Sequence, residues 1–123
     1  MILGIGTDII SITRLNNALE RIAERVFTPS EILSAGDTVH RNERLAGRWA
    51  AKEALAKALG CGIGEKCSWL DVEVSNTPNG CPEMILSGRA LQTFMAMGGN
   101  KIHLSISHEK EYASAFVIIE GEK

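Results

Sequence analysis

The feature that most constrains this chain is a run of strong helix formers near its centre, Arg48-Trp49-Ala50-Ala51-Lys52-Glu53-Ala54-Leu55-Ala56-Lys57-Ala58. Alanine, leucine, lysine and glutamate favour the helix, so the run predicts a regular helix from about Glu43 to Leu59, with Gly60 as its terminator. Glu53 and Lys57 then lie one turn apart on one face. A carboxylate beside a lysine can hold a divalent cation and steady a phosphate at the same place.

The same spacing also has an ordinary explanation. A glutamate followed four residues later by a lysine forms a common surface ion pair, worth about 0.3–0.5 kcal/mol and without function. Arg48 and Lys52 could likewise form a solvated face of the helix. The helix alone therefore leaves both interpretations open.

Length, composition and charge limit the class of protein. The chain has 123 residues, of which 45% are hydrophobic and 23% charged, so we expect a soluble globular protein with a single domain over residues 1–123. The net charge of −2 provides no general attraction for nucleic acid. No apolar run approaches the about 20 residues that a membrane span needs, and the first residues lack a positive region. We expect a cytoplasmic protein without nucleic-acid or membrane partners.

The three cysteines, Cys61, Cys67 and Cys81, do not form a recognisable framework. Their number is odd, and they have neither C-x-x-C spacing nor a nearby paired histidine. We expect free thiols in a reducing compartment.

Periodicity and turn signals predict the secondary structure. The expected strands are Ile2–Asp8, Trp69–Val74, Glu83–Leu86, Ile102–Ser107 and Ala113–Glu120. The expected helices are Ser11–Val26, a short helix from the capping box Thr28-Pro29-Ser30-Glu31 to near Gly36, the central Glu43–Leu59, and Arg89–Met97. Polar loops or turns are expected at Asp37–Asn42, Gly60–Gly64, Thr77–Gly80 and His108–Tyr112. The sum is an α+β fold with a largely antiparallel sheet packed with helices.

Glycines interrupt the first strand and follow the central helix. Gly4 and Gly6 would let another backbone or a ligand come close to the strand. The Gly60–Gly64 loop could bind a phosphate or could be a simple turn, and the pattern does not decide between them.

Charged residues from distant parts of the sequence form one candidate site. Asp8 and Glu53 are two carboxylates that suit Mg²⁺, which keeps waters and completes its shell with substrate phosphates. Lys57, Arg48 and His108 would supply positive charge for a pyrophosphate. Asp8 could instead cap the following helix, and His108 could be an ordinary exposed loop residue.

A row of arginines lies along the first expected helix. Arg14, Arg21 and Arg25 share one side of it, about a quarter turn from the apolar stripe. This cationic ridge could bind an acidic partner or be no more than surface charge.

Three segments, far apart in the sequence, together resemble the signatures of the holo-acyl-carrier-protein synthases, the short bacterial type of phosphopantetheinyl transferase. They are Gly4-Ile5-Gly6-Thr7-Asp8-Ile9, then Leu45-Ala46-Gly47-Arg48-Trp49-Ala50-Ala51-Lys52-Glu53-Ala54 with Lys57-Ala58, and Ser105-Ile106-Ser107-His108. The resemblance runs in the right order from residue 2 to about residue 119. It implies a 4'-phosphopantetheinyl transferase-like fold and a trimer with active sites between subunits.

The resemblance also implies a reaction. Such enzymes transfer phosphopantetheine from coenzyme A to a serine of apo acyl carrier protein, with release of adenosine 3',5'-bisphosphate, in support of fatty acid biosynthesis. Two further interpretations remain open from the residues: a Mg²⁺-dependent nucleotide pyrophosphatase, because water could use the same groups, and a non-catalytic module that binds coenzyme A or the carrier.

The resemblance assigns roles to individual residues, grouped here by what they would contact. The metal ligands would be Asp8 and Glu53. The incoming serine must lose a proton, and our own hypothesis is that Glu53 takes it, directly or through a metal-bound water. Lys57 and His108 would be catalytic, since they would contact the phosphates and help to carry the developing charge. Arg48 would reach the adenosine end, and Gly62 and Ser107 would also contact coenzyme A. Arg14 matches the position of the family's carrier-docking arginine, and Arg21 and Arg25 would extend the same face toward the acidic carrier.

Overall fold

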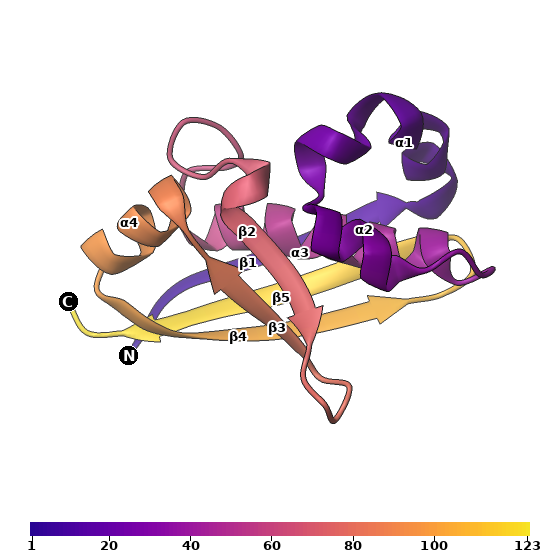
Figure 1. The fold of residues 1–123 in the computed structure, drawn as a ribbon. Coiled ribbons are helices and arrows are strands. Elements are labelled where there is room, and N and C mark those ends of the chain that lie inside the picture. The colour runs from indigo at the N-terminus through magenta and orange to yellow at the C-terminus, as the bar shows by residue number, and fades with distance from the viewer.

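Helix α3 (Arg41–Ala58) lies at the centre of the molecule, between a three-stranded sheet and a β-hairpin (Figure 1). The computed structural model describes residues 1–123. The other elements, in chain order, are β1 (Ile2–Ser11), α1 (Ile12–Val26), α2 (Pro29–Ala35), the 3-10 turn η1 (Trp69–Asp71), β2 (Val72–Asn76), β3 (Pro82–Leu86), α4 (Gly88–Ala96), β4 (Gly99–His108) and β5 (Tyr112–Gly121).

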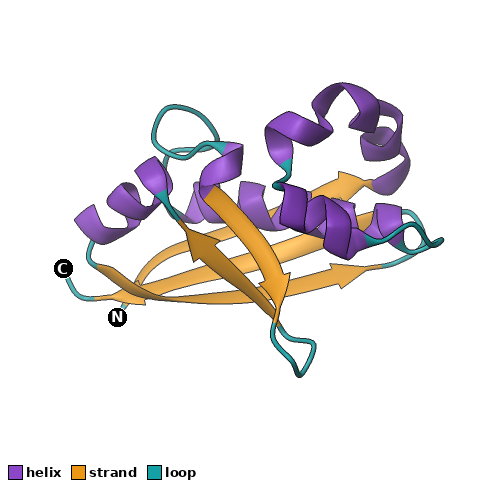
Figure 2. Ribbon diagram, in the orientation of Figure 1, coloured by secondary structure: helices purple, strands orange, loops and turns teal.

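All strand pairs are antiparallel, as the sequence predicts. The large sheet has the order β1-β5-β4, and β2 and β3 form a separate two-stranded sheet (Figure 2). Helices and the hairpin cover one face of the large sheet, and the α+β prediction is confirmed. No helix is long and apolar enough to cross a membrane.

The two glycines of β1 allow α3 to pack directly on the strand. A Cβ atom on Gly4 would lie 2.0 Å from the carbonyl oxygen of Ala58, and one on Gly6 would lie 1.8 Å from that of Ala54. Both distances are far shorter than any van der Waals contact. The expected close approach of another backbone is therefore confirmed, and α3 is that backbone.

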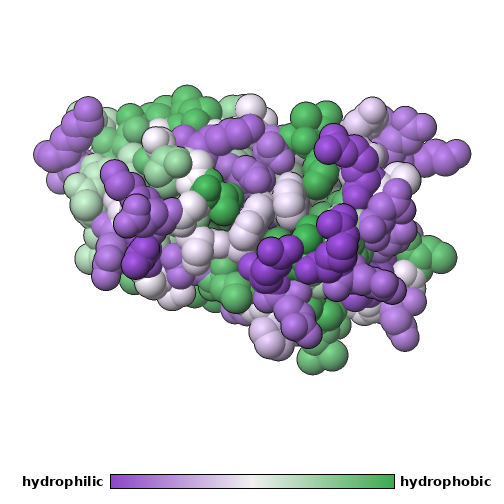
Figure 3. Space-filling model, turned by 90° about the horizontal axis from the view of Figure 1, so that it is seen from above, coloured by the Kyte–Doolittle hydropathy of each residue, from purple (hydrophilic) through white to green (hydrophobic).

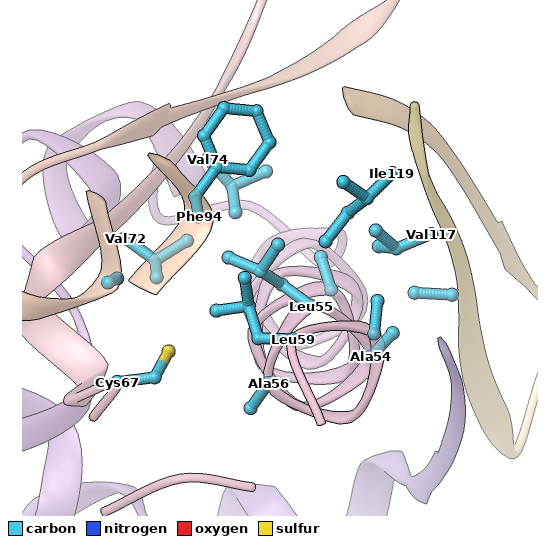
Figure 4. Close-up of a cluster of buried hydrophobic side chains, with 14 of the residues drawn as sticks. Ala54, Leu55, Ala56, Leu59, Cys67, Val72, Val74, Phe94, Val117 and Ile119 are labelled. Carbon is cyan, nitrogen blue, oxygen red and sulfur yellow. The ribbon is translucent and has the colours of Figure 1, made fainter. Parts of the chain in front are cut away.

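The main core surrounds α3 (Figure 4). Leu55 and Leu59 point toward the hairpin and α4, where they meet Val72, Val74 and Phe94. The opposite side of the helix carries alanines, which pack against the sheet residues Val117 and Ile119. Small residues on this side let the helix and the sheet approach closely. A second cluster lies under α1 and α2, with Leu15, Phe27 and Leu45 at its centre.

Several element boundaries differ from the sequence prediction. Strand β1 continues three residues beyond Asp8, because Ile9, Ile10 and Ser11 still pair with β5. The predicted strand from Trp69 begins instead as the turn η1, and the strand itself is β2. The sequence predicts a loop at Arg41 and Asn42, which are the first two residues of α3 in the structure. Strands β4 and β5 each extend beyond their predicted bounds.

The second face of the large sheet carries no helix. Alternation along β1 and β5 places Ile5, Ile9 and Phe116 on this face, with 56%, 66% and 46% of their surface exposed. Monomeric proteins seldom expose contiguous apolar surfaces of this kind.

Candidate active site

Two carboxylates and a lysine line one cavity of about 400 Å³ between β1, α1 and α3. Asp8 comes from β1, and Glu53 and Lys57 come from α3. The Nζ atom of Lys57 donates to the Asp8 carboxylate at 3.1 Å and to the carbonyl oxygen of Thr7 at 3.0 Å. Lys57 thus pairs with Asp8 rather than with Glu53, so the alternative of an ordinary Glu53–Lys57 surface ion pair is wrong.

The local folds explain why these groups meet. Side chains alternate along a strand, so Asp8 points to the same face as Gly6, which is the face that α3 covers. Glu53 and Lys57 are four residues apart and project from α3 toward the same cavity. Asp8 does not cap α1, since Ser11 is the N-cap and accepts a hydrogen bond from the Arg14 amide at 3.3 Å.

The electrostatics of the cavity favour a cation. Burial and the nearby Asp8 carboxylate raise the pKa of Glu53 above its ordinary value, while Lys57 acts in the opposite direction. Two carboxylates that repel each other are relieved when a positive charge comes between them. The pair therefore fits a hard divalent cation with open coordination positions, although no cluster of three or more candidate ligands is present.

The far side of this cavity is apolar. Leu15 and Ile22 line it from α1 and Ile10 from β1, while Arg14 is one of its polar lining residues. Trp49 lines it from α3, one turn before Glu53, and its ring lies 4.3 Å from that of Trp69. The sequence analysis assigned no role to Trp49, although its position four residues before Glu53 places it on the same face.

Arg48 and His108 line a different cavity, of about 250 Å³, near the start of α3. His108 is the last residue of β4 rather than a loop residue, and its Nδ1 atom lies 3.5 Å from the Glu43 carboxylate. Arg48 donates to the carbonyl oxygen of Glu31 and has only 7% of its surface exposed. The interpretation of Arg48 and Lys52 as a solvated helix face is wrong, since both are buried.

Within one chain, the candidate residues therefore do not come together in a single site. Asp8 pairs with Ala115, and β4 lies beyond β5, so Asp8 and His108 are on opposite edges of the sheet. Two strand spacings already separate their backbones by about 10 Å. Ser107 lines a third cavity, at one end of the sheet face that carries no helix. Gly62, with a φ of 67°, lies in the loop after α3 and lines none of these three cavities.

The cationic ridge is fully accessible. Arg14, Arg21 and Arg25 are all exposed on α1, and none of them is paired with a carboxylate. Figure 3 shows strongly hydrophilic side chains concentrated over the part of the helical side that α1 and α2 occupy. Arg14 also lines the carboxylate cavity, so the ridge and this cavity are continuous.

The fold and the paired carboxylates beside a lysine agree with the class to which comparison assigns the chain. A family model described as the 4'-phosphopantetheinyl transferase superfamily matches residues 4–117, and the chain belongs to this superfamily of enzymes. Its curated relatives include the holo-[acyl-carrier-protein] synthase of Clostridium tetani, 49% identical over 99% of this chain and 98% of the relative. That of Koribacter versatilis is 41% identical over 98% of this chain and 99% of the relative.

Solved structures agree with this assignment. A holo-(acyl-carrier-protein) synthase from Bacillus anthracis, in complex with CoA (3',5'-ADP), covers 99% of both chains at 42% identity with a TM-score of 0.85. The enzyme from Neisseria meningitidis gives a TM-score of 0.88 at 35% identity, over 98% of this chain and 99% of that chain. The family and fold expected from the three sequence segments are confirmed.

Proposed function

We propose that this protein transfers phosphopantetheine from coenzyme A to a serine of apo acyl carrier protein and releases adenosine 3',5'-bisphosphate. The observation that carries the proposal is the cavity that joins Asp8, Glu53 and Lys57 to the exposed Arg14. It offers a cation site, a phosphate partner and a docking surface in one place. The function of the curated relatives, and the coenzyme A bound to a structural relative, support the same reaction. The product would serve fatty acid biosynthesis in the cytoplasm.

The reaction would depend on Mg²⁺ held by Asp8 and Glu53. These two carboxylates would leave coordination positions of the ion open, which suits a cation that keeps waters and binds substrate phosphates. Bound there, the ion would neutralise charge on the phosphoryl group as the bond to the leaving group breaks. The raised pKa of Glu53, which results from burial and from the nearby Asp8 carboxylate, supports this placement, because a bound cation would offset both effects.

The protein's own groups would divide the remaining work. Lys57, whose ammonium group already lies at the cavity, would stabilise the charge that develops on the phosphate. Glu53 would accept the proton of the serine hydroxyl as that oxygen forms its bond to phosphorus. His108, Arg48, Ser107 and Gly62 would contact coenzyme A.

We propose a homotrimer that completes the site between subunits. Within one chain, His108 and Arg48 lie in a different cavity from Asp8, so a neighbouring copy has to supply them if one substrate is to contact both sets. The exposed Ile5, Ile9 and Phe116 on the open sheet face support association, since a second copy would remove them from water.

The carrier would dock on the cationic ridge. Acyl carrier proteins are acidic by the resemblance described above, and complementary charge accelerates encounter and fixes orientation. Arg14, Arg21 and Arg25 are free of intramolecular ion pairs and are therefore available to a partner. The continuity of Arg14 with the cavity would lead the bound carrier's serine toward the carboxylates.

The proposal is tested by following the mass of the carrier. The purified protein is incubated with coenzyme A, Mg²⁺ and apo acyl carrier protein, with Asp8→Asn and Glu53→Gln enzymes as controls. A mass gain equal to phosphopantetheine that disappears without metal and in both variants is the expected result.

Two other outcomes would overturn the proposal. An unchanged carrier with cleaved coenzyme A would indicate the pyrophosphatase, in which water replaces the serine. No reaction with several different carriers would indicate a binding module. Sedimentation of the same sample measures the trimer independently of turnover.

A further inference from the structure

A buried ion pair behind the active-site cavity has no role in the reaction described above. Lys52 precedes Glu53 on α3 but points away from the cavity, and its side chain is fully buried with that of Glu31 from α2. The Nζ atom of Lys52 lies 2.7 Å from Oε1 of Glu31. A buried pair of this kind is a weak source of stability, because removing two charges from water is costly.

The Lys52 ammonium group makes three hydrogen bonds, each to a different segment. It donates to the carbonyl oxygen of Val26 at 2.6 Å, to Glu31 at 2.7 Å and to the carbonyl oxygen of Trp69 at 3.1 Å. These three acceptors belong to the end of α1, to α2 and to the turn η1. An ammonium group has three protons, so its capacity is used completely.

Glu31 completes the network on the other side. Its Oε1 atom also accepts from the backbone amide of Thr28, and its Oε2 atom accepts from that of Val74, both at 2.9 Å. The negative group therefore lies at the start of α2 and the positive group at the end of α1. Both placements are favourable to the helix dipoles. Burial lowers the pKa of Lys52, while the hydrogen bond and charge of Glu31 oppose that shift.

This network connects the end of α1 to α3, the two helices that line the active-site cavity. Helix α1 forms one wall and presents the cationic ridge, and α3 forms the opposite wall and presents Glu53 and Lys57. Apart from its capping bonds to the adjacent residues, α1 has two hydrogen bonds to the rest of the protein: the Ile12 amide donates to the Glu111 carbonyl oxygen at 2.9 Å, and Lys52 donates to the Val26 carbonyl oxygen at the other end. Apolar contacts hold the helix between these two points.

We propose that Lys52 is a positioning residue, which holds the end of α1 against α3 and so sets where the docked carrier lies relative to Glu53. This inference rests on the proposed carrier docking. Without the ammonium group, the C-terminal half of α1 keeps its apolar contacts but loses its directional bond to α3. The ridge then presents the carrier serine in a less defined position, whereas the groups that bind coenzyme A are unchanged.

The first test is Lys52→Met, which keeps an unbranched side chain one heavy atom shorter and removes the charge. The catalytic efficiency toward the carrier, per folded enzyme, should fall about tenfold, the size of an ordinary coupling between neighbouring sites. The KM for coenzyme A should not change. Ile119→Ala is the control, because Ile119 is fully buried in the sheet opposite Gly4 and away from α1. It should lower stability and leave both constants per folded enzyme as they are.

A double-mutant cycle then separates positioning from simple destabilisation. If Lys52 acts through α1, Arg14→Glu should weaken carrier use less in the Lys52→Met enzyme than in the wild type. Additive effects of the two changes, or an equal rise in both KM values, would overturn the proposal. Glu31→Gln weakens the same network with a smaller change and gives the same test if Lys52→Met does not fold.

Hydrogen exchange provides a readout that does not depend on turnover. Amides in the last turns of α1 should exchange faster in Lys52→Met than in Ile119→Ala at equal global stability. Unchanged exchange in α1 would refute the positioning role. If the wild-type enzyme does not modify a carrier, the docking proposal fails, but the exchange result still reports whether Lys52 fixes α1.

Discussion

Gly6 of β1 lies directly beneath the Ala54 carbonyl of α3, so close that a Cβ atom on Gly6 would stand 1.8 Å from that oxygen. Because Glu53 precedes Ala54 and Asp8 follows Gly6 on the same face of the strand, this contact also sets how near the two carboxylates come. The absence of a side chain at residue 6 is thus a condition for the cavity that Asp8, Glu53 and Lys57 line.

Gly6→Ala should destabilise the protein by about 3 kcal/mol, because backbone rather than a flexible side chain blocks the new methyl group. Gly64→Ala is the matched control, since nothing lies within 4 Å of a Cβ atom at Gly64. Urea denaturation measures both. Equal stability of the two variants would show that α3 can move away from β1 at little cost.

Glu53→Gln should stabilise the metal-free protein at neutral pH. The pKa of Glu53 is higher in the folded protein than its ordinary value of 4.5, so the folded state holds this proton more tightly than the unfolded chain. Stability contributed by Glu53 is therefore present at low pH and declines as the pH rises from that ordinary value through the folded pKa. Thermal melts at a series of pH values, with a chelator present, should show Glu53→Gln to be more stable than the wild type only above this pH range. An advantage that persists unchanged at pH 3 would contradict the electrostatic cause.

Lys57→Gln should lower kcat by about 10²- to 10³-fold, the usual effect of removing one group that stabilises developing charge. It should also raise the pKa of Glu53 further, since the Lys57 charge opposes the rise in the wild type. The acidic limb of the pH–rate profile then moves to higher pH. Lys66→Gln, an exposed lysine in the loop before η1, is the control and should change neither quantity.

Arg14→Glu should raise the KM for the carrier and leave the KM for coenzyme A unchanged, because Arg14 is an exposed and unpaired cation at the mouth of the cavity. The effect should shrink as ionic strength rises, since salt screens exposed charges. Lys66→Glu makes the same change of charge away from α1. A similar loss in both variants would indicate a general effect of net charge rather than docking.

Cys67 should resist thiol reagents in the folded protein, whereas Cys81 should react quickly. Burial raises the pKa of Cys67 to about 12, and the residue has no exposed surface. Cys81 is exposed in the turn before β3. Alkylation followed by peptide mass analysis measures both rates. Modification of Cys67 without denaturant at the rate of Cys81 would show that this part of the core opens readily.

The sequence predicts those parts of the molecule that depend on local pattern. The helix around Glu53 and Lys57, the glycines of β1 and the capping box at Thr28 all follow from spacing and backbone preference, and the structure confirms them. The cavity between Asp8 and α3 is harder to predict from the sequence. It depends on the pairing of β1 with β5, which neither segment reveals by itself.

The errors have a common physical cause. Charged residues are usually exposed, so the sequence allows Arg48 and Lys52 to be interpreted as a solvated face of the helix. In the structure both are buried, and backbone carbonyls and one carboxylate accept their hydrogen bonds. Sequence patterns do not reveal such partners, which lie 17 to 26 residues away along the chain. The boundaries of β1 and β4 were missed for a related reason: strand ends depend on the neighbouring strand.

Helix α3 spans the sheet from edge to edge, and contacts near each end leave it little freedom. A Cβ atom on Gly47 would lie 2.9 Å from Ile106 of β4, and Gly4 of β1 lies against Ala58. Each added residue lengthens a helix by about 1.5 Å and turns everything after it by about 100°. A single insertion between Arg48 and Glu53 would therefore rotate the Glu53 carboxylate away from Asp8. Variation in chain length among functional homologues should consequently be confined to the connecting loops, and α3 should keep a constant number of residues.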